Sequence, residues 1–484
     1  MARLMWFRRD LRIHDNPALL AAIAGASTDA QSGGENDDRV IPLVLIDPAL
    51  WPTWGHLKQA YLVDSLAALN ESLGGNLVIK HAKAQEIIPE IAAKYGITAV
   101  HSAADFSSYG IARDEEVKNS LAKLGIDYEI TGSGYAVAPG RVTKDDGTAY
   151  KVYTPFYKRW LVHGWRAPAP DPKSWPQWWA PENDGLPPRP EIGEVVLPPA
   201  GEQAALARWK DFLANDVNDY AENRNRPDIA GTSKLGTALK WGEIHPRTML
   251  AQLGDQQGQE VFRKEIAWRE FYADVLFHNP HTVENYLNPL YAQMKYDTGA
   301  IADERFAAWC AGRTGYPFVD AGMRQLRAEG WMHNRVRMVV ASFLIKDLHL
   351  EWQRGARYFM DLLLDGDLAS NSHGWQWTAG CGTDASPYYR VFNPIGQGHR
   401  FDPQGDYVRK YIPELRHIPD GSVHEPWTVV GGLDHGYPEP IVDHALERKE
   451  ALARLSALPK GVQLPPKSEE LPEPNQTKLI HDFE

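Results

Sequence analysis

A proline-rich stretch divides the 484-residue chain into two parts, each of which is expected to form a domain. Ten of the 35 prolines fall within residues 168–199. Proline fixes φ and removes a backbone donor, so neither a continuous helix nor a central strand can run through this stretch. The chain also exceeds the size at which a single hydrophobic core stops growing. The sequence therefore predicts two domains joined by a proline-rich connector.

The part of the chain before this connector alternates between strand and helix patterns. Short apolar runs predict strands at 4–7, 40–46, 77–79 and 99–101. Helical spacing predicts helices at 57–73, 84–95 and 112–124, with Pro89 placing the start of the second near Ile88. Asn16 and Pro17 predict another helix start, and the polar residues 27–38 predict a loop. This alternation predicts an α/β domain with a Rossmann-like parallel sheet.

Helical patterns fill the chain after the connector. They lie at 204–213, 258–277, 303–310, 320–329, 336–352 and 357–364. Five prolines and scattered charges after Leu458 predict a weakly ordered tail. We therefore expect an α/β domain at 1–132, a connector at 133–200, an all-α domain at 201–457 and a tail at 458–484.

Composition limits the classes of function. No apolar run reaches the length of about 18 residues that a membrane span needs, and the first ten residues carry three Arg with no apolar stretch behind them. We expect a cytoplasmic protein without a secretory signal. Two Cys offer neither a disulfide framework nor a Cys-based zinc site, and no metal site is predicted. Seventeen Trp indicate stacking surfaces or a large aromatic ligand in addition to core packing.

The net charge of -12 argues against diffuse binding to nucleic acid, but the charge is unevenly distributed. Residues 263–410 hold 17 Lys and Arg against 17 Asp and Glu, so the acidic excess lies outside them. Within them Arg324, Arg327, Arg335 and Arg337 have one acid nearby, Glu329. This cluster is either a local basic patch or an ordinary solvated face.

The sequence Gly-Thr-Ser-Lys-Leu-Gly at 231–236 precedes a helical run at 237–240. Hydroxyls and free backbone N–H groups at the start of a helix can bind an anion such as a cofactor phosphate. Simple helix capping by Thr232 or Ser233 is the alternative. The stretch is not a Walker motif.

Two further segments place polar groups beside aromatic rings. On a helix, Glu265 and Trp268 share a face, where they could grip a flat base or could be an ordinary surface acid above a buried Trp. Helical spacing also places Trp331, Arg335 and Met338 on one face, with Asn334 at its border. An amide, a guanidinium and a thioether suit a stacked base next to a phosphate. A lone His333 is interpreted as structural.

The stretch 365–377 is the densest mixture of side-chain chemistry in the chain. It holds two carboxylates, an amide and two indoles, which a plain core segment would not need: Asp365, Asp367, Asn371, Trp375 and Trp377.

The order of these motifs resembles that of the photolyase and cryptochrome family. The matching segments cover nearly the whole chain: 7–12, 231–235, 268–272, 314–317, 331–338, 365–377 and 393–394. The resemblance implies a nucleotide-fold antenna domain and a helical domain that holds a folded FAD. It also implies light-driven electron transfer to a damaged pyrimidine pair, and its closest match is the class I photolyases for cyclobutane dimers.

The resemblance implies these FAD contacts: Tyr220, Thr232, Ser233, Lys234, Leu235, Arg337, Asp365, Asp367 and Asn371. Arg337 would pair with Asp365, and Asn371 would face the flavin N5. A neutral amide there does not repel an anionic reduced flavin, whereas a carboxylate would repel it or supply a proton. Plant-type cryptochromes carry Asp at this place, so Asn371 favours a photolyase whose working cofactor is the reduced anion.

The resemblance also implies a lesion-binding set for cyclobutane pyrimidine dimers: Arg224, Glu265, Trp268, Asn334, Arg335, Met338 and Trp377. The (6-4) branch of the family has a second His where this chain has Asn334. The dimer would be flipped out of the duplex, because chemistry on a base requires leaving the stack. We predict that Glu265 lies in a partly desolvated pocket and donates to a thymine carbonyl. The expected partner is UV-damaged DNA, bound by a monomer.

Trp375 and Trp352 match the inner members of the family's photoreduction relay. Its outer member is usually Trp, but the equivalent here is Tyr296. A tyrosine can be oxidised only if its proton has an acceptor, so we expect proton-coupled hopping through Tyr296 or an exit through another aromatic. Tyr109 and Gly110 resemble members that hold 8-hydroxy-5-deazaflavin as antenna, since folate-binding members carry Asn-Glu there, and a folate is the alternative.

The predicted function is therefore light-driven repair of cyclobutane pyrimidine dimers by electron transfer from excited reduced FAD. A blue-light receptor of the cryptochrome type is the alternative, although Asn371 and the short tail after Leu458 weigh against it. A flavin-free, Trp-rich nucleic-acid binder would be a colourless protein.

Overall fold

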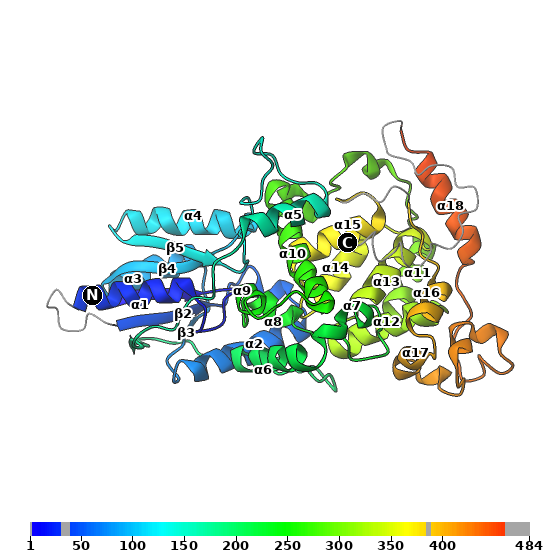
Figure 1. The fold of residues 1–484 in the computed structure, drawn as a ribbon, viewed down its shortest axis with the longest axis horizontal. Helices are drawn as coiled ribbons and strands as arrows, with labels where there is room; N and C mark the ends of the chain where they lie inside the picture. The colour runs from blue at the N-terminus through cyan, green and yellow to red at the C-terminus, as the bar shows by residue number, and fades with distance from the viewer. Residues whose placement is uncertain (1, 31–38, 384–388, 460–484) are drawn as a thin grey trace.

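The computed structural model describes residues 2–30, 39–383 and 389–459, which form a sheet-containing domain beside a helical domain (Figure 1). The sheet domain is drawn on the left of Figure 1 and the helical domain on the right. This confirms the predicted α/β and all-α division of the fold. In the described part of the chain, every helix is too short or too polar to span a membrane.

The strands of the first domain form one parallel sheet. Their bounds are β1 Ala2–Phe7, β2 Arg39–Leu45, β3 Val78–Lys80, β4 Ile97–Ala104, β5 Asp127–Ser133 and β6 Gln177–Trp178. The order is β3-β2-β1-β4-β5, so β2 and β3 lie on one side of β1, and the later strands β4 and β5 lie on the other. This reversal next to β1 creates a crevice at the carboxyl ends of the strands, where α/β proteins bind ligands.

Helices cover both faces of this sheet, as parallel strands require. They are α1 Pro17–Ala30, α2 His56–Ser72, α3 Ala84–Lys94 and α4 Ser108–Ala122. Successive side chains of a strand point to opposite faces. Met5 and Phe7 therefore pack in the core with α1 and α2, whereas Leu4 and Trp6 pack in the core with α3 and α4.

The four predicted strands are confirmed, but two strands are not apparent from the sequence pattern. The edge strand β5 is mostly exposed and polar, and so it lacks an apolar run. The two-residue β6 lies inside the proline-rich stretch and pairs with Arg39 and Val40 of β2. Part of that stretch therefore extends the sheet.

Two predicted helix boundaries in this domain are wrong. The helix α3 begins at Ala84 rather than near Ile88, and Pro89 lies inside it, where its missing N–H costs one backbone hydrogen bond. The helix α1, whose start is capped by Asn16, continues to Ala30, so the first residues of the predicted 27–38 loop are helical. Residues 31–38, and 460–484 of the predicted tail, lie outside the described residues.

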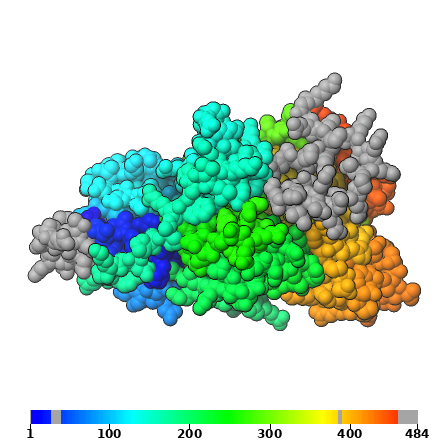
Figure 2. All heavy atoms as spheres, in the orientation of Figure 1, coloured from blue at the N-terminus to red at the C-terminus, as the bar shows by residue number. Residues whose placement is uncertain are grey.

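The helical domain is preceded by α5 Tyr153–His163, which lies over α10 near the junction of the domains (Figure 1). The space-filling view shows this part of the chain, in teal, projecting from the surface (Figure 2). The domain itself consists of α6 Glu202–Asn215, α7 Tyr220–Asn223, α8 Gly236–Trp241, α9 Pro246–Leu250, α10 Gln257–His278, α11 Ala300–Ala311, α12 Pro317–Glu329, α13 Asn334–Lys346, α14 Trp352–Leu362, α15 Leu368–Ala379, α16 Pro394–Phe401, α17 Asp406–Tyr411 and α18 His444–Ser456.

The helix α13 lies at the centre of the largest hydrophobic core, where Val340 and Leu344 are fully buried. The predicted helix 336–352 is wrong, because α13 ends at Lys346 and α14 begins at Trp352. His349 between them has a left-handed φ of 54°, which a helix cannot contain. Trp331 also precedes α13, so it does not share a helix face with Arg335 and Met338 as predicted.

Buried polar contacts join the two domains. The Glu243 carboxylate, in the link after α8, accepts hydrogen bonds from Tyr61 Oη at 2.7 Å, Ser65 Oγ at 2.6 Å and the Gly201 backbone N–H at 2.8 Å. Burial raises the pKa of Glu243. Next to it Gly242 has a φ of 71°, and a Cβ there would lie 1.9 Å from the Arg9 carbonyl oxygen. The missing side chain of Gly242 therefore lets the end of α8 lie against the segment that follows β1.

Candidate functional site

Arg337 and Asp365 form the centre of a polar group between α13 and α15. Arg337 Nη2 lies 2.8 Å from Asp365 Oδ2, and Arg337 Nε donates to the Met332 carbonyl. The other carboxylate oxygen, Asp365 Oδ1, is buried without a hydrogen-bond partner. A Cβ on Gly236, at the start of α8, would lie 2.8 Å from Asp365 Oδ2. The predicted Arg337 and Asp365 pair is therefore present, with an unused acceptor beside it.

The segment 232–235 forms a strained loop next to this pair. Lys234 has a left-handed φ of 54°, a conformation that costs energy for a residue other than glycine. Arg208 donates to the carbonyls of Ser233 at 2.9 Å and Thr232 at 2.8 Å. Leu235 occupies the N-cap of α8, and no side chain caps this helix. Simple capping by Thr232 or Ser233 is therefore wrong.

Asp367 is the N-cap of α15 and also contacts the sheet domain. Its Oδ1 accepts from the Ser370 N–H at 3.1 Å, and its Oδ2 lies 2.6 Å from Arg9 Nη2. Burial opposes the charged form, but Arg9, Lys240 and Arg269 outweigh it and hold the pKa of Asp367 below its ordinary value. Asp367 therefore remains a carboxylate.

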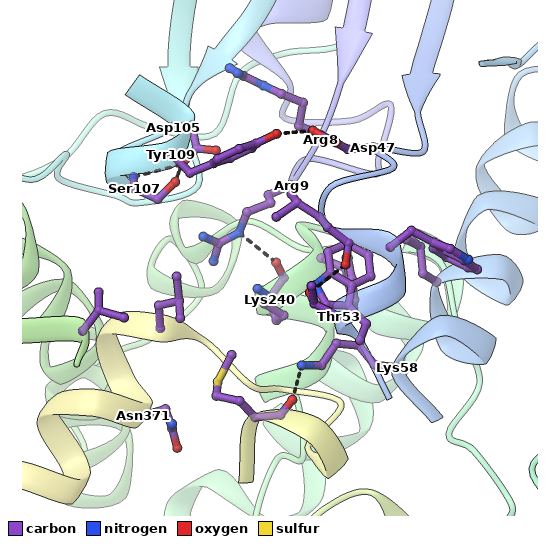
Figure 3. A pocket seen from close by; sticks show the side chains of 18 of the residues that line it. Arg8, Arg9, Asp47, Thr53, Lys58, Asp105, Ser107, Tyr109, Lys240 and Asn371 are labelled. Atoms are coloured by element: carbon purple, nitrogen blue, oxygen red, sulfur yellow. Dashed lines mark hydrogen bonds between the residues drawn. The ribbon is translucent and has the colours of Figure 1, made fainter. Parts of the chain in front are cut away.

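The side chain of Asn371 on α15 has a fixed orientation. Its Nδ2 donates to the Ala356 carbonyl on α14 at 3.0 Å. The amide therefore presents its oxygen to other partners. Figure 3 shows Asn371 at the helical end of a cavity between the domains. Tyr220, another predicted contact, is buried among Phe212 and Phe262.

The predicted lesion-binding residues cluster around α10 and α13. Glu265 is half-buried, with its Oε1 2.7 Å from Arg224 Nη2. Trp268 stacks flat on Tyr153 of α5, with ring centroids 3.7 Å apart and an interplanar angle of 8°. The alternative of an ordinary surface acid above a buried Trp does not hold, because Glu265 is ion-paired and Trp268 is only half-buried. Tyr153 is a support that sequence reasoning missed.

Arg335 belongs to a different group of cations from the one predicted. Arg324 pairs with Glu414 at 2.7 Å and Arg337 with Asp365, so the four arginines do not form one face. Arg335 Nη2 instead donates to Asn225 Oδ1 at 2.8 Å. Burial, together with Arg224, Arg400 and Arg390, lowers the pKa of Arg335 to about 9. These four arginines form a local excess of positive charge, and a phosphate nearby would relieve their repulsion.

The remaining predicted lesion residues have different exposures. Asn334 is exposed at the start of α13, Met338 is half-buried one turn later, and Trp377 is half-buried on α15. His333 caps α13 by accepting from the Arg335 N–H at 3.2 Å, and burial lowers its pKa to about 3. His333 is therefore structural, as predicted.

Aromatic rings extend in two directions from Trp375 of α15, and the first leads to α14. Trp375 is buried, and a Cβ on Gly355, one turn after Trp352, would lie 2.1 Å from its ring. Trp352 faces Tyr286 edge-on, with ring centroids 6.1 Å apart. Tyr286 and Tyr296 influence each other's ionisation, and burial raises the pKa of Tyr296 well above its ordinary value. Tyr286 thus lies beside both Trp352 and Tyr296.

A second aromatic direction runs through Trp309. Its ring centroid lies 6.2 Å from that of Trp375, and it stacks on Phe306 at 5.8 Å. Trp309 is fully buried, and its Nε1 donates to the Val340 carbonyl at 3.1 Å. Trp309 is therefore the candidate for the alternative electron route, through an aromatic residue other than Tyr296, that the sequence left open.

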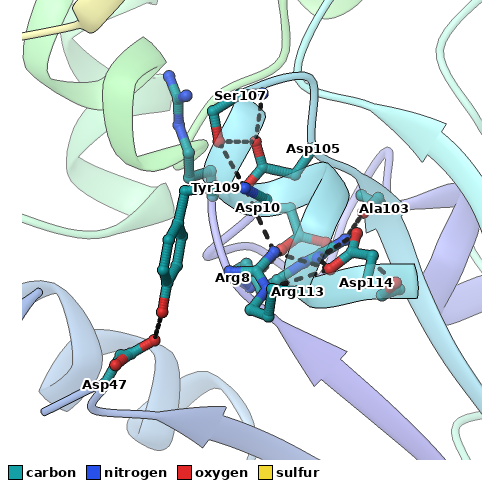
Figure 4. A network of polar contacts seen from close by, with 12 residues as sticks. Arg8, Asp10, Asp47, Ala103, Asp105, Ser107, Tyr109, Arg113 and Asp114 are labelled. Carbon is teal, nitrogen blue, oxygen red and sulfur yellow. Dashed lines mark hydrogen bonds and ion pairs between the residues drawn. The ribbon is translucent and has the colours of Figure 1, made fainter. Parts of the chain in front are cut away.

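A cavity of about 510 Å³ lies at the carboxyl ends of β1, β2 and β4 and extends to α14 and α15. Tyr109 lines it, and the Tyr109 hydroxyl donates to Asp47 across the crevice (Figures 3 and 4). Gly110 packs on Asp105 so tightly that a Cβ would lie 2.2 Å from its carboxyl carbon. Beside it Arg8 and Arg113 share Asp114 (Figure 4). The cavity lies where the strand order predicts a ligand.

The chain matches two sequence families. Residues 3–174 match the family described as DNA photolyase, and residues 262–457 match the FAD binding domain of DNA photolyase. The deoxyribodipyrimidine photo-lyase of Escherichia coli is 36% identical over 95% of this chain and 99% of its own length.

Two solved structures resemble the fold along nearly its full length. A class III photolyase from Agrobacterium tumefaciens is 36% identical with a TM-score of 0.83, over 94% of this chain and 98% of the other. An archaeal photolyase from Sulfolobus tokodaii, solved with two FAD molecules, is 28% identical with a TM-score of 0.78, over 94% of this chain and 100% of the other.

Proposed function

The chain belongs to the DNA photolyase family, and we infer from this that it is a deoxyribodipyrimidine photolyase, which repairs cyclobutane pyrimidine dimers in DNA with light. The observation that carries this conclusion is the full-length match to a deoxyribodipyrimidine photo-lyase at 36% identity. The alternative, a blue-light receptor, is not favoured. Class I and class III photolyases both remain candidates, because the Agrobacterium structure is of class III.

The residues of the helical domain fit FAD. The unused buried acceptor Asp365 Oδ1, the Arg337 cation beside it and the strained loop at Lys234 are suited to a polar ligand that carries hydroxyls and phosphates. Reduced FAD, when bound and excited, supplies the electron that splits the dimer. We propose that Asp365 and Asp367 hold the cofactor and that the Asn371 amide oxygen faces the flavin, where it adds no negative charge.

The α10 and α13 residues are suited to a flipped-out dimer. Trp268, supported by Tyr153, offers a flat platform for one base, and Met338 and Trp377 offer apolar surface. Arg224 and Arg335 belong to the arginine group that would attract phosphates despite the net charge of -12. We therefore propose that affinity for damaged DNA falls as salt is raised.

Illumination of the purified protein without oxygen, in the presence of an oligonucleotide with one thymine dimer, tests this function. We expect restored thymines in the light and none in the dark. A coloured, FAD-containing protein that restores no thymine under these conditions would instead favour a light receptor. A colourless protein would favour a flavin-free nucleic-acid binder.

The variant Glu265→Gln tests whether this side chain, protonated and released from Arg224 in the complex, donates to the dimer. A glutamine can still donate through its amide, so we expect dimer affinity to fall by less than about tenfold while the repair yield per absorbed photon falls more strongly. The measurements are dimer binding in the dark and thymine recovery in the light. Glu260→Gln is the matched control, since Glu260 lies on the same helix and pairs with Lys264 at 3.8 Å. Complete loss of binding in Glu265→Gln would contradict a donor role.

We propose that Trp375, Trp352 and Tyr296 relay electrons from the surface, with Tyr286 between the last two. The variant Tyr296→Phe cannot release a proton, so we expect the reduction of bound oxidised FAD by light to slow severalfold in transient absorption. Trp309→Phe is the comparison on the second aromatic direction. A tryptophan radical with an unchanged lifetime in Tyr296→Phe, but lost in Trp309→Phe, would assign the route to the buried Trp309.

We propose that the cavity at Tyr109 holds the antenna, a ring of the 8-hydroxy-5-deazaflavin type rather than a folate. The absence of Asn-Glu at Tyr109 and Gly110 supports this, because the acid that would contact a pterin is missing. We also propose that the protein acts as a cytoplasmic monomer that joins the nucleoid when bound to DNA. The proposed divisions at residues 132, 200 and 457 stay predictions.

A further inference from the structure

The helix α5 presents an aromatic face to α10, over which it lies (Figure 1). Tyr153, Tyr157 and Trp160 form this face at the spacing of successive helical turns, and all three are buried. Tyr153 lies flat on Trp268 of α10 and also stacks on Tyr157, with ring centroids 5.8 Å apart and an interplanar angle of 19°. The ring of Trp268 is therefore held from one side by α5, although it remains half-exposed.

Two hydrogen bonds fix the position of α5 along α10. Tyr153 Oη donates to the Lys264 carbonyl at 2.8 Å, and Trp160 Nε1 donates to Glu270 Oε2 at 2.7 Å. The two bonds lie about two helical turns apart on each helix, which is about 10 Å, and Trp268 lies between them on α10. Because their order is the same on both helices, any sliding of α5 along α10 would break both bonds.

The Glu270 carboxylate accepts three hydrogen bonds although its side chain is only 2% exposed. Besides the Trp160 indole, its Oε2 accepts from the Val137 backbone N–H at 3.0 Å, and its Oε1 accepts from the Ala136 backbone N–H. These donors belong to α5 and to the segment that leads into it. Protonation would turn one acceptor oxygen into a hydroxyl donor facing an N–H group, so the full set of bonds requires the carboxylate.

The charged groups near Glu270 lie on its own helix. Arg269 favours the carboxylate, and Asp274, one turn further along, faces His278 at 3.8 Å. Among the described residues, the donors that α5 and the segment 134–140 offer to Glu270 are uncharged. Burial raises the pKa of Glu270 to about 7, against the three hydrogen bonds and Arg269. Both forms of Glu270 are therefore populated near neutral pH.

We propose that Glu270 is a positioning residue for lesion recognition. Through Trp160 its carboxylate holds α5 in register with α10, and α5 in turn holds Tyr153 flat against Trp268. This inference rests on the proposed role of Trp268 as the platform for one base of the dimer. Ordering a mobile side chain on binding lowers affinity, so a ring that is already fixed binds the dimer more tightly. Glu270 thus acts on the dimer without touching it.

A double-mutant cycle tests whether Glu270 acts through Tyr153. The quantity measured is the dimer preference, the ratio of affinities for one oligonucleotide with and without the dimer, in FAD-loaded protein in the dark. Glu270→Gln places an amide NH₂ against N–H donors, so it should lower the preference by about tenfold, as should Tyr153→Leu. The double variant should be no worse than Tyr153→Leu alone. Losses that multiply, or an unchanged preference in Glu270→Gln, would overturn the proposal.

Two further variants separate positioning from folding. Trp160→Phe removes one donor and keeps the Glu270 carboxylate, so it should lower the dimer preference even if Glu270→Gln does not fold. Asp320 of α12 is the matched control, because it is a buried carboxylate that accepts the N–H groups of Thr314 at 2.8 Å and Gly315 at 3.0 Å. Asp320→Asn should lower the melting temperature and leave the preference unchanged. An equal loss of preference in Asp320→Asn and Trp160→Phe would assign the effect to stability and overturn the proposal.

The pH dependence of the unaltered protein gives a measurement that needs no variant to fold. Above pH 7 Glu270 is a carboxylate and holds α5, whereas below pH 7 it gains a proton and loses an acceptor. The dimer preference should therefore fall by up to about tenfold between about pH 8.5 and 5.5. Comparison with Glu270→Gln at each pH removes the contribution of other groups such as Glu265. Identical pH profiles of the two proteins would overturn the proposal.

The same titrations separate this proposal from the proposed function. An unaltered protein that shows no preference for the dimer at any pH would contradict lesion recognition itself. A clear preference that survives in both Glu270→Gln and Trp160→Phe would overturn the positioning role of Glu270 and leave the photolyase function intact.

Discussion

Arg337→Met should lose FAD. The substitution leaves the Asp365 carboxylate, whose side chain is 11% exposed, without its cation at 2.8 Å. Breaking a buried pair by removing one partner costs about 3–5 kcal/mol, and the same arginine is the cation nearest to the proposed cofactor contact. We expect FAD affinity to fall by about a hundredfold or more, measured as the ratio of flavin to protein absorbance after purification and by titration with added FAD.

The matched control is Arg324→Met. Arg324 lies on the neighbouring α12 and pairs with Glu414 at 2.7 Å with similar exposure, but it does not approach Asp365. The Arg324→Met variant should lower the melting temperature without changing the FAD content. If both variants lose FAD in proportion to their loss of stability, Arg337 acts through folding and not through the cofactor.

Trp268→Ala should have the largest effect on recognition of the lesion. Stacking of a base on an aromatic side chain contributes about 1–3 kcal/mol, so dimer affinity should fall by about ten- to a hundredfold. Trp268→Phe should recover most of this affinity, because a phenyl ring can still stack on Tyr153. The measurement is the ratio of affinities for the same oligonucleotide with and without the dimer.

Trp427→Ala controls for the loss of a large ring elsewhere. Trp427 is half-buried and lies edge-on to Tyr316, with ring centroids 6.0 Å apart. This variant should keep the full preference for the dimer. An unchanged preference in Trp268→Ala itself would assign the platform to another residue, with Trp377 the next candidate.

The sequence allowed the fold class and most segments of regular structure to be predicted, because these depend on local spacing of apolar residues. Local spacing failed where tertiary contacts decided the outcome. β5 is a polar edge strand that forms because β4 offers a partner. The break between α13 and α14 is fixed by contacts such as that of Asp347 with His444 of α18, far along the chain.

In the candidate site, residues of one local motif could likewise be predicted, whereas their distant partners could not. Asp365, Asp367 and Asn371 could be identified because they stand together in one motif. Their partners could not, since Asp367 pairs with Arg9 across 358 residues of sequence. Likewise, only the fold brings Tyr153 under Trp268 and Arg224 to Glu265. Pairings at this separation carry no local pattern.

The buried Glu243 carboxylate has a consequence for the proposed transfer of excitation from an antenna to the flavin. It ties α2 of the sheet domain, the end of the connector and the residue after α8 at a single point through three short hydrogen bonds. Transfer of excitation between two pigments depends steeply on their separation and on the angle between their transition dipoles. A hinge at this junction would vary both quantities from one molecule to the next. If the cavity holds the proposed antenna, a rigid joint gives every molecule the same coupling between antenna and flavin, although Glu243 does not line the cavity.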